Sequence, residues 1–72
     1  MAQFTHDQYE ALERAIAEGL RIAVYRRGTE YVVIPAALRL REGREAVEAV
    51  HPTTGERIIL ILDEIDGFEV VR

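Results

Sequence analysis

The sequence predicts a small α+β domain, in which one N-terminal helix precedes five or six antiparallel strands that curl into a small β-barrel. Apolar side chains recur at helical spacing near the N-terminus, and short apolar segments separated by tight turns follow. Consecutive strands joined by such turns are antiparallel neighbours. Because 72 residues cannot supply two full sheets, we expect one domain spanning residues 1–72, with a helix over about 6–18 and a barrel over about 20–71.

The helix has signals at both of its ends. Thr5 is typical of an N-cap, and Gln8 three residues later completes a capping box. Gly19 can adopt the left-handed conformation that ends a helix. The apolar residues between these caps form one stripe, which we expect to cover the sheet: Tyr9, Leu12, Ala15, Ile16 and Leu20.

The pattern then changes to the alternation of strands. We expect a first strand over Leu20–Tyr25, a hairpin turn over Arg26–Thr29 and a second strand over Glu30–Ile34. Pro35 has no N–H to donate, so it should either end the ladder or bend it. A third short strand is expected over Leu38–Arg41, where leucine and arginine alternate.

The C-terminal half continues with strands and turns. After a turn at Glu42-Gly43, a fourth strand is expected over Arg44–His51, followed by a turn at residues 52–55. Residues 57–63 form the fifth strand, and an acidic turn leads to a short closing strand over residues 68–71. The run from Ile58 to Leu62 contains only aliphatic residues, which predicts burial on both faces of this strand. A curled sheet would cover one face, and the helix or a second subunit the other.

Composition excludes several classes of protein. The chain has no cysteine, so it has neither a disulfide framework nor a thiolate metal site. His6 and His51 have no third ligand at metal spacing, and the acidic turn lacks the spaced ligands of a calcium loop. There is no serine and no glycine-rich phosphate loop. We therefore expect a non-catalytic protein that has no catalytic residue, metal site or cofactor.

Charge and hydropathy bear on location and on partners. No apolar segment has the length of a membrane helix and no secretory signal is visible, so we expect a cytoplasmic protein that does not bind membranes. The net charge is −4, which disfavours a surface that binds nucleic acid all over. All nine basic residues are arginine, which fits a GC-rich genome.

Two surfaces are candidates for binding. Arg26, Arg39, Arg41 and Arg44 could form a local site for an anionic ligand or single-stranded nucleic acid, because guanidinium groups bind phosphate and carboxylate in a bidentate manner. The alternative for these arginines is a solvated polar face balanced by neighbouring glutamates.

The second candidate surface is apolar. Two of the expected strands are apolar on both faces, whereas one helix can cover only about one of them. The surplus, which we place on Val33, Ile59 and Ile61, could be buried in a homo-oligomer, either a dimer or a small ring.

Residues 20–71 resemble the WYL domain. The matching stretches begin with Leu20–Arg26 and Val32–Pro35, and the single matching positions are Tyr25, Pro35, Leu38, Gly43, Ala49, Gly55, Asp63 and Ile65. This resemblance implies an Sm-like, Src-homology-3-like small β-barrel. It also implies a regulatory module of transcription that senses a ligand, with nucleotides or nucleic acid as the common proposal.

The sequence departs from the family at the positions tied to ligand binding. The Trp-Tyr-Leu triplet of the family falls on Glu45-Ala46-Val47, and the arginine of its Asp-Arg-Ile motif falls on Glu64. The resemblance therefore supports the fold more than the ligand. Two functions stay open: a regulatory module that binds an anionic ligand, and a structural module that forms a homo-oligomer or binds another protein.

Overall fold

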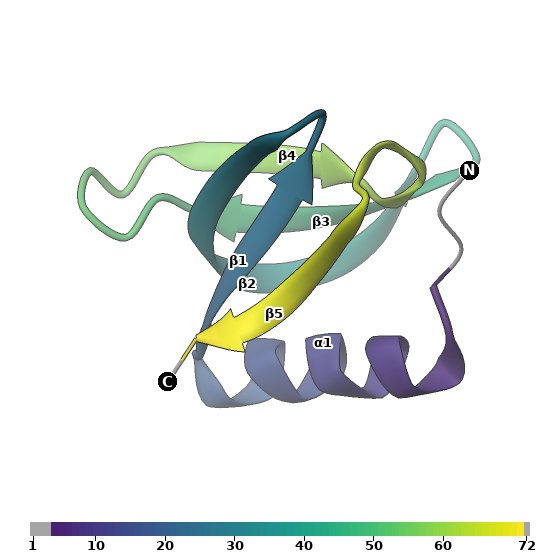
Figure 1. The fold of residues 1–72 in the computed structure, drawn as a ribbon, viewed down its shortest axis with the longest axis horizontal. Coiled ribbons are helices and arrows are strands. Elements are labelled where there is room, and N and C mark those ends of the chain that lie inside the picture. The colour runs from purple at the N-terminus through teal and green to yellow at the C-terminus, as the bar shows by residue number, and fades with distance from the viewer. Residues whose placement is uncertain (1–3, 72) are drawn as a thin grey trace.

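The computed structural model describes residues 4–71, which form one helix followed by a five-stranded sheet (Figure 1). In chain order the elements are α1 (His6–Glu18), β1 (Arg21–Arg26), β2 (Thr29–Arg41), β3 (Arg44–Val50), β4 (Arg57–Ile61), the 3-10 helix η1 (Leu62–Glu64) and β5 (Gly67–Val71). Every pairing is antiparallel, in the order β4-β3-β2-β1-β5. The α+β class is confirmed. The sheet is not closed, because β4 and β5 lie at its two ends.

The predicted caps of α1 are present. The Thr5 hydroxyl accepts a hydrogen bond from the Gln8 backbone N–H at 3.2 Å, and the Thr5 N–H donates to the Gln8 side chain at 2.8 Å. Gly19 ends the helix with φ 68°. These contacts satisfy backbone groups that the first and last helical turns leave unpaired.

Two tight turns set the registers of the hairpins. Arg27 and Gly28 both have positive φ, and so do Glu42 and Gly43. Two successive residues of positive φ make a type I′ turn, whose twist matches that of the flanking strands. The β1–β2 and β2–β3 hairpins therefore close with two-residue loops, as the sequence predicts.

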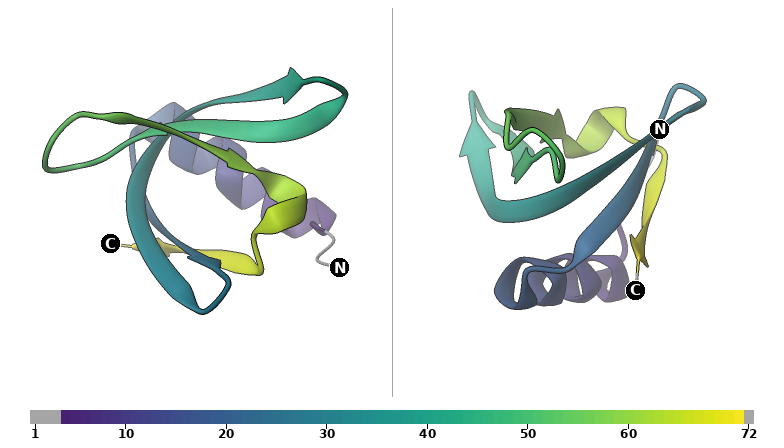
Figure 2. Two further views of the ribbon diagram at one scale, coloured as in Figure 1. Left: turned by 90° about the horizontal axis from the view of Figure 1, so that it is seen from above. Right: turned by 90° about the vertical axis from the view of Figure 1, so that its left-hand side faces the viewer.

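The structure corrects the prediction of separate strands before and after Pro35. β2 is one continuous strand from Thr29 to Arg41, and its pairing with β3 is irregular between Pro35 and Ala37. Pro35 is fully buried, so its ring fills the core while the missing N–H is accommodated at the irregularity. The strand bends here, and Figure 2 shows β2 curving to take part in both halves of the sheet.

The structure also corrects the prediction for residues 57–63. β4 ends at Ile61, and the chain then turns into η1. Within one chain only one face of β4 is buried, because Leu60 is 1% exposed while Ile59 is 42% exposed, so the helix does not cover the second face. A chain of this size covers one face of β4 with its own core and leaves the other face without a layer.

The core lies between α1 and the concave face of the sheet. α1 runs across one open end of the curled sheet (Figure 1). Phe4 stacks on Phe68 with their ring centroids 5.6 Å apart. The buried cluster comprises Leu12, Ala15, Ile22, Val24, Val33, Val47, Ala49, Leu60, Leu62 and Ile65.

Candidate functional site

The face of the sheet that points away from the core carries most of the predicted binding residues. Val47 of β3 and Leu60 of β4 oppose each other and belong to the core. Because side chains alternate along a strand, their neighbours point to the opposite side, which we call the outer face. The register places Ile61 opposite Ala46, and Ile59 opposite Glu48, on this outer face.

Four aliphatic residues form an outer patch, defined as Ile34, Val50, Ile59 and Ile61. Val50 lies opposite Ile34 in β2, which connects the patch across three strands. Ile59 is the most exposed of the four, and the others are half-buried. The patch therefore presents β-branched side chains that this chain only partly covers.

Val33 does not belong to this patch, which corrects its assignment to an interface. It is 1% exposed and packs in the core. Its neighbours Val32 and Ile34 take the outer face instead. In a uniformly apolar stretch, the sequence pattern does not indicate which alternate residues point inward. It therefore does not tell whether Val33 or its neighbours face the core.

Three of the predicted arginines come together at the end of the β2–β3 hairpin. Arg41 lies directly opposite Arg44, and Arg39 is two residues before Arg41 on the same face. Arg39 Nε lies 3.2 Å from a carboxylate oxygen of Glu48. Among residues 4–71, no ion pair is found for Arg41.

The 3-10 helix η1 supplies carboxylates to two of the arginines. Arg44 Nη1 lies 3.6 Å from Glu64, and its Nε lies 3.9 Å from Asp63. Arg26 approaches the other oxygen of Glu64 at 3.9 Å and stacks over the Tyr31 ring at 5.6 Å. The arginines thus form a charge-balanced surface network, and exposed pairs of this kind each contribute little to stability.

The hydrogen-bonding pattern of β4 can be traced from the turn that precedes it. The His51 N–H donates to the Glu56 carbonyl at 2.8 Å, so these residues occupy a hydrogen-bonded position of the ladder. The next pair, Val50 and Arg57, is therefore a non-hydrogen-bonded pair, because the two kinds alternate in antiparallel sheets.

This alternation leaves one set of backbone groups unpaired. Ile58 and Leu60 bond to β3, whereas Arg57, Ile59 and Ile61 direct their N–H and C=O groups away from it. Within residues 4–71, β4 pairs only with β3. We call this the open edge of β4. Its backbone groups and the outer patch lie side by side, because the same residues supply both.

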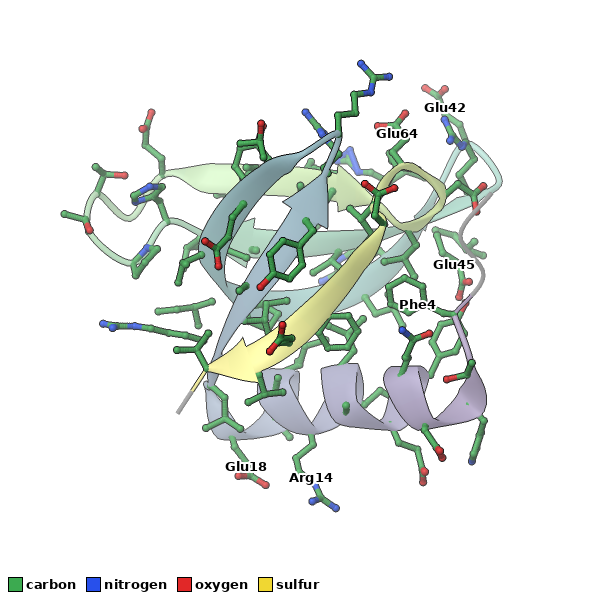
Figure 3. The ribbon with its side chains drawn as sticks, viewed as in Figure 1. Phe4, Arg14, Glu18, Glu42, Glu45 and Glu64 are labelled. Carbon is green, nitrogen blue, oxygen red and sulfur yellow. The ribbon has the colours of Figure 1, made fainter. Side chains whose placement is uncertain are left out.

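Two tyrosines form contacts that the sequence does not reveal. The Tyr9 hydroxyl donates to Glu45, which reaches from the β2–β3 hairpin to the first turns of α1 (Figure 3). The hydrogen bond to Glu45, with a smaller effect of burial, raises the pKa of Tyr9. The Tyr25 hydroxyl donates to Glu69 at 3.2 Å, and this bond likewise raises the pKa of Tyr25.

A shallow groove on the remaining surface lies between α1 and β5. Its volume is about 280 Å³. Charged side chains of both signs from α1 line it, together with Leu20 and Val70. Among the described residues, no three His, Cys, Asp or Glu side chains are grouped to hold a metal ion. The single α-helix in this part of the chain is too short and too polar to cross a membrane.

In comparisons with known proteins, no protein-family model matches the chain, and a search of curated proteins finds no match.

Proposed function

We propose that this chain is a non-catalytic protein-interaction module that associates with a second copy of itself through the outer patch and the open edge of β4. The observation that carries the proposal is Ile59, a residue that is 42% exposed and whose backbone groups face an unpaired edge. Burial of aliphatic side chains and pairing of free backbone groups would both favour association.

The composition of β4 supports this proposal. Proteins usually protect an edge strand with lysine, proline, an inward-pointing charge or a bulge. β4 has none of these between its ends, since only aliphatic residues follow Arg57. A strand of this kind is prone to pair with another strand, and a specific partner removes that liability.

The assignment to small β-barrels and to WYL-like regulatory domains is part of the proposal. It is supported by the order of elements, one helix followed by five antiparallel strands with two type I′ turns, and by the matching residues Tyr25, Pro35, Leu38 and Gly43. In that setting the chain would act in the cytoplasm as an assembly unit of a regulator.

The test is the solution mass, measured by light scattering from low micromolar to millimolar concentration. We expect the 8.2 kDa chain to approach the mass of a dimer, and Ile59→Glu to remain a monomer because a charge would be placed in the contact. Val32→Glu is the matched control, since Val32 is similarly exposed at 39% but lies in the part of β2 that pairs with β1. A wild-type chain that stays monomeric at every concentration would exclude the proposal.

A second candidate is an anion-binding module, and the observation that favours it is the cluster of Arg39, Arg41 and Arg44 on one face. Arg41 has no carboxylate partner among the described residues, so it would make the first contact. Binding of a short single-stranded oligonucleotide should then fall steeply with salt. It should also be lost in the Arg39→Ala, Arg41→Ala double variant; unchanged binding would exclude this candidate.

A further inference from the structure

We infer that the second copy docks with its own β4 antiparallel to the first, across a two-fold axis, so that Arg57 of each copy meets Asp63 of the other. This inference rests on the proposed self-association and adds its symmetry, its alignment and the charged residues that determine it. The two five-stranded sheets would then join edge to edge into one continuous sheet.

The charges at the two ends of the segment determine its direction. Arg57 and Asp63 flank five aliphatic residues, so the segment is positive at its start and negative at its end. Antiparallel pairing places the start of one copy beside the end of the other, and the two-fold axis repeats this contact. Parallel pairing would instead place Arg57 beside Arg57, and like charges in register are destabilising.

The backbone groups on the open edge allow this pairing. Arg57, Ile59 and Ile61 are the residues of β4 that direct hydrogen-bonding groups outward. With the axis at Ile59, Ile59 faces itself and Arg57 faces Ile61 of the second copy. Three hydrogen-bonded pairs result, and each exchanges two N–H···O=C bonds, so every open group of β4 is paired.

The side chains agree with the same alignment. Residues that oppose each other in an antiparallel pair point to the same face, so the outer patches of the two copies become contiguous. The methylene groups of Arg57 can lie along Ile61 of the second copy while the guanidinium reaches toward Asp63. Asp63 can accept this contact, because its side chain is 64% exposed and its own partner, Arg44, lies 3.9 Å away.

The other open strand is a less suitable partner. β5 has a single charge among its five residues, Glu69, which already accepts the Tyr25 hydroxyl. Within its own five residues β5 therefore offers Asp63 no positively charged partner. Pairing of β4 with β5 would also be head-to-tail, which produces rings or filaments rather than dimers.

The test exchanges the charges. Arg57→Glu and Asp63→Arg should each weaken homodimerisation by about tenfold or more, because each places like charges together at both ends of the contact. An equimolar mixture of the two variants should form a heterodimer. At one end of its contact the two substituted positions carry opposite charges, and at the other end the native Arg57 and Asp63 meet.

Two further variants complete this test. The double variant Arg57→Glu, Asp63→Arg should dimerise again, because opposite charges then meet at both ends. Arg14→Glu is the matched control for Arg57→Glu, because it makes the same charge reversal on the exposed side of α1 (Figure 3). It should leave the mass of the dimer unchanged. This control shows whether a loss of dimer is caused by the change in net charge or by the position of the substituted residue.

The outcomes separate the inference from the proposed function. Circular dichroism confirms that each variant is folded, and light scattering gives the masses. A wild-type dimer that neither reversal weakens, or a mixture that gains no mass, would overturn the two-fold docking while self-association stands. A wild-type mass above that of a dimer would also overturn it, in favour of β4–β5 pairing. A wild-type monomer would overturn both.

Discussion

At the scale of single residues, Tyr9 connects α1 to the β2–β3 hairpin. Its hydroxyl donates to Glu45, 36 positions along the chain, and it also packs against Phe4 with ring centroids 5.6 Å apart. The hydrogen bond requires a neutral phenol, which is why the pKa of Tyr9 is raised above its usual value. A contact between segments so distant in sequence helps to hold the helix over the open end of the sheet.

The Tyr9→Phe variant tests this contact. We expect it to lower the free energy of unfolding by a few tenths to about 1 kcal/mol, because one exposed hydrogen bond is lost while the aromatic ring remains. Since the folded pKa lies above the unfolded value, the contribution of the hydroxyl is complete below about pH 10 and is lost as the pH rises through the folded pKa. Urea unfolding at neutral and alkaline pH measures this, and a difference between the two proteins that is constant over that range would contradict it.

At the scale of elements, β4 has two faces with different roles. Leu60 points into the core, and Ile59 points to the outer face beside the open edge. The strand β4 thus contributes to the core on one side and leaves an apolar surface on the other. The residues of β4 that follow Arg57 are all apolar because alternate side chains have different partners. One set packs in the core, and in our proposal the other set contacts a second copy.

Alanine substitutions should separate these two roles. Leu60→Ala removes a fully buried side chain and should cost about 2–5 kcal/mol of stability. Ile59→Ala should cost less than about 1 kcal/mol at low protein concentration, because much of that side chain is exposed already. Chemical denaturation of the dilute proteins gives both values, and equal losses would mean that the two faces are assigned incorrectly.

At the scale of the whole molecule, size determines what the chain can cover. One helix and one curled sheet enclose a core of about ten buried residues and leave the outer face of β4 without a layer. Small domains bury a smaller fraction of their surface than large ones, so they often gain stability from association. The outer patch is therefore expected to influence stability as well as oligomeric state.

Thermal unfolding should consequently depend on protein concentration. A dimer that binds only in its folded form raises Tm as concentration increases, since mass action favours the associated native state. We expect this dependence for the wild-type chain and for Val32→Glu, and its absence for Ile59→Glu. Differential scanning calorimetry over a wide concentration range measures it, and a wild-type Tm that does not move would argue against association.

Local chemistry explains which features the sequence predicted well. The capping box of Thr5 and Gln8, the C-cap at Gly19 and the turn at Gly28 each depend on residues a few positions apart. Their effects are confined to one turn of backbone, so they can be read without knowledge of the fold. The order of these signals along the chain predicts the α+β class and the antiparallel pairing.

Tertiary packing decided the remaining features. Whether Pro35 ended a strand or bent it depended on a core that could accept its ring, and whether Val33 or its neighbours faced outward depended on the position of α1 and β4. The carboxylate partners of Arg26 and Arg44 were set by where η1 folds against the sheet. The caps, the turns and the fold class can therefore be read from the sequence, because each depends on neighbouring residues. Which face of an apolar strand is buried, and which arginines are paired, depends instead on contacts between residues far apart in sequence.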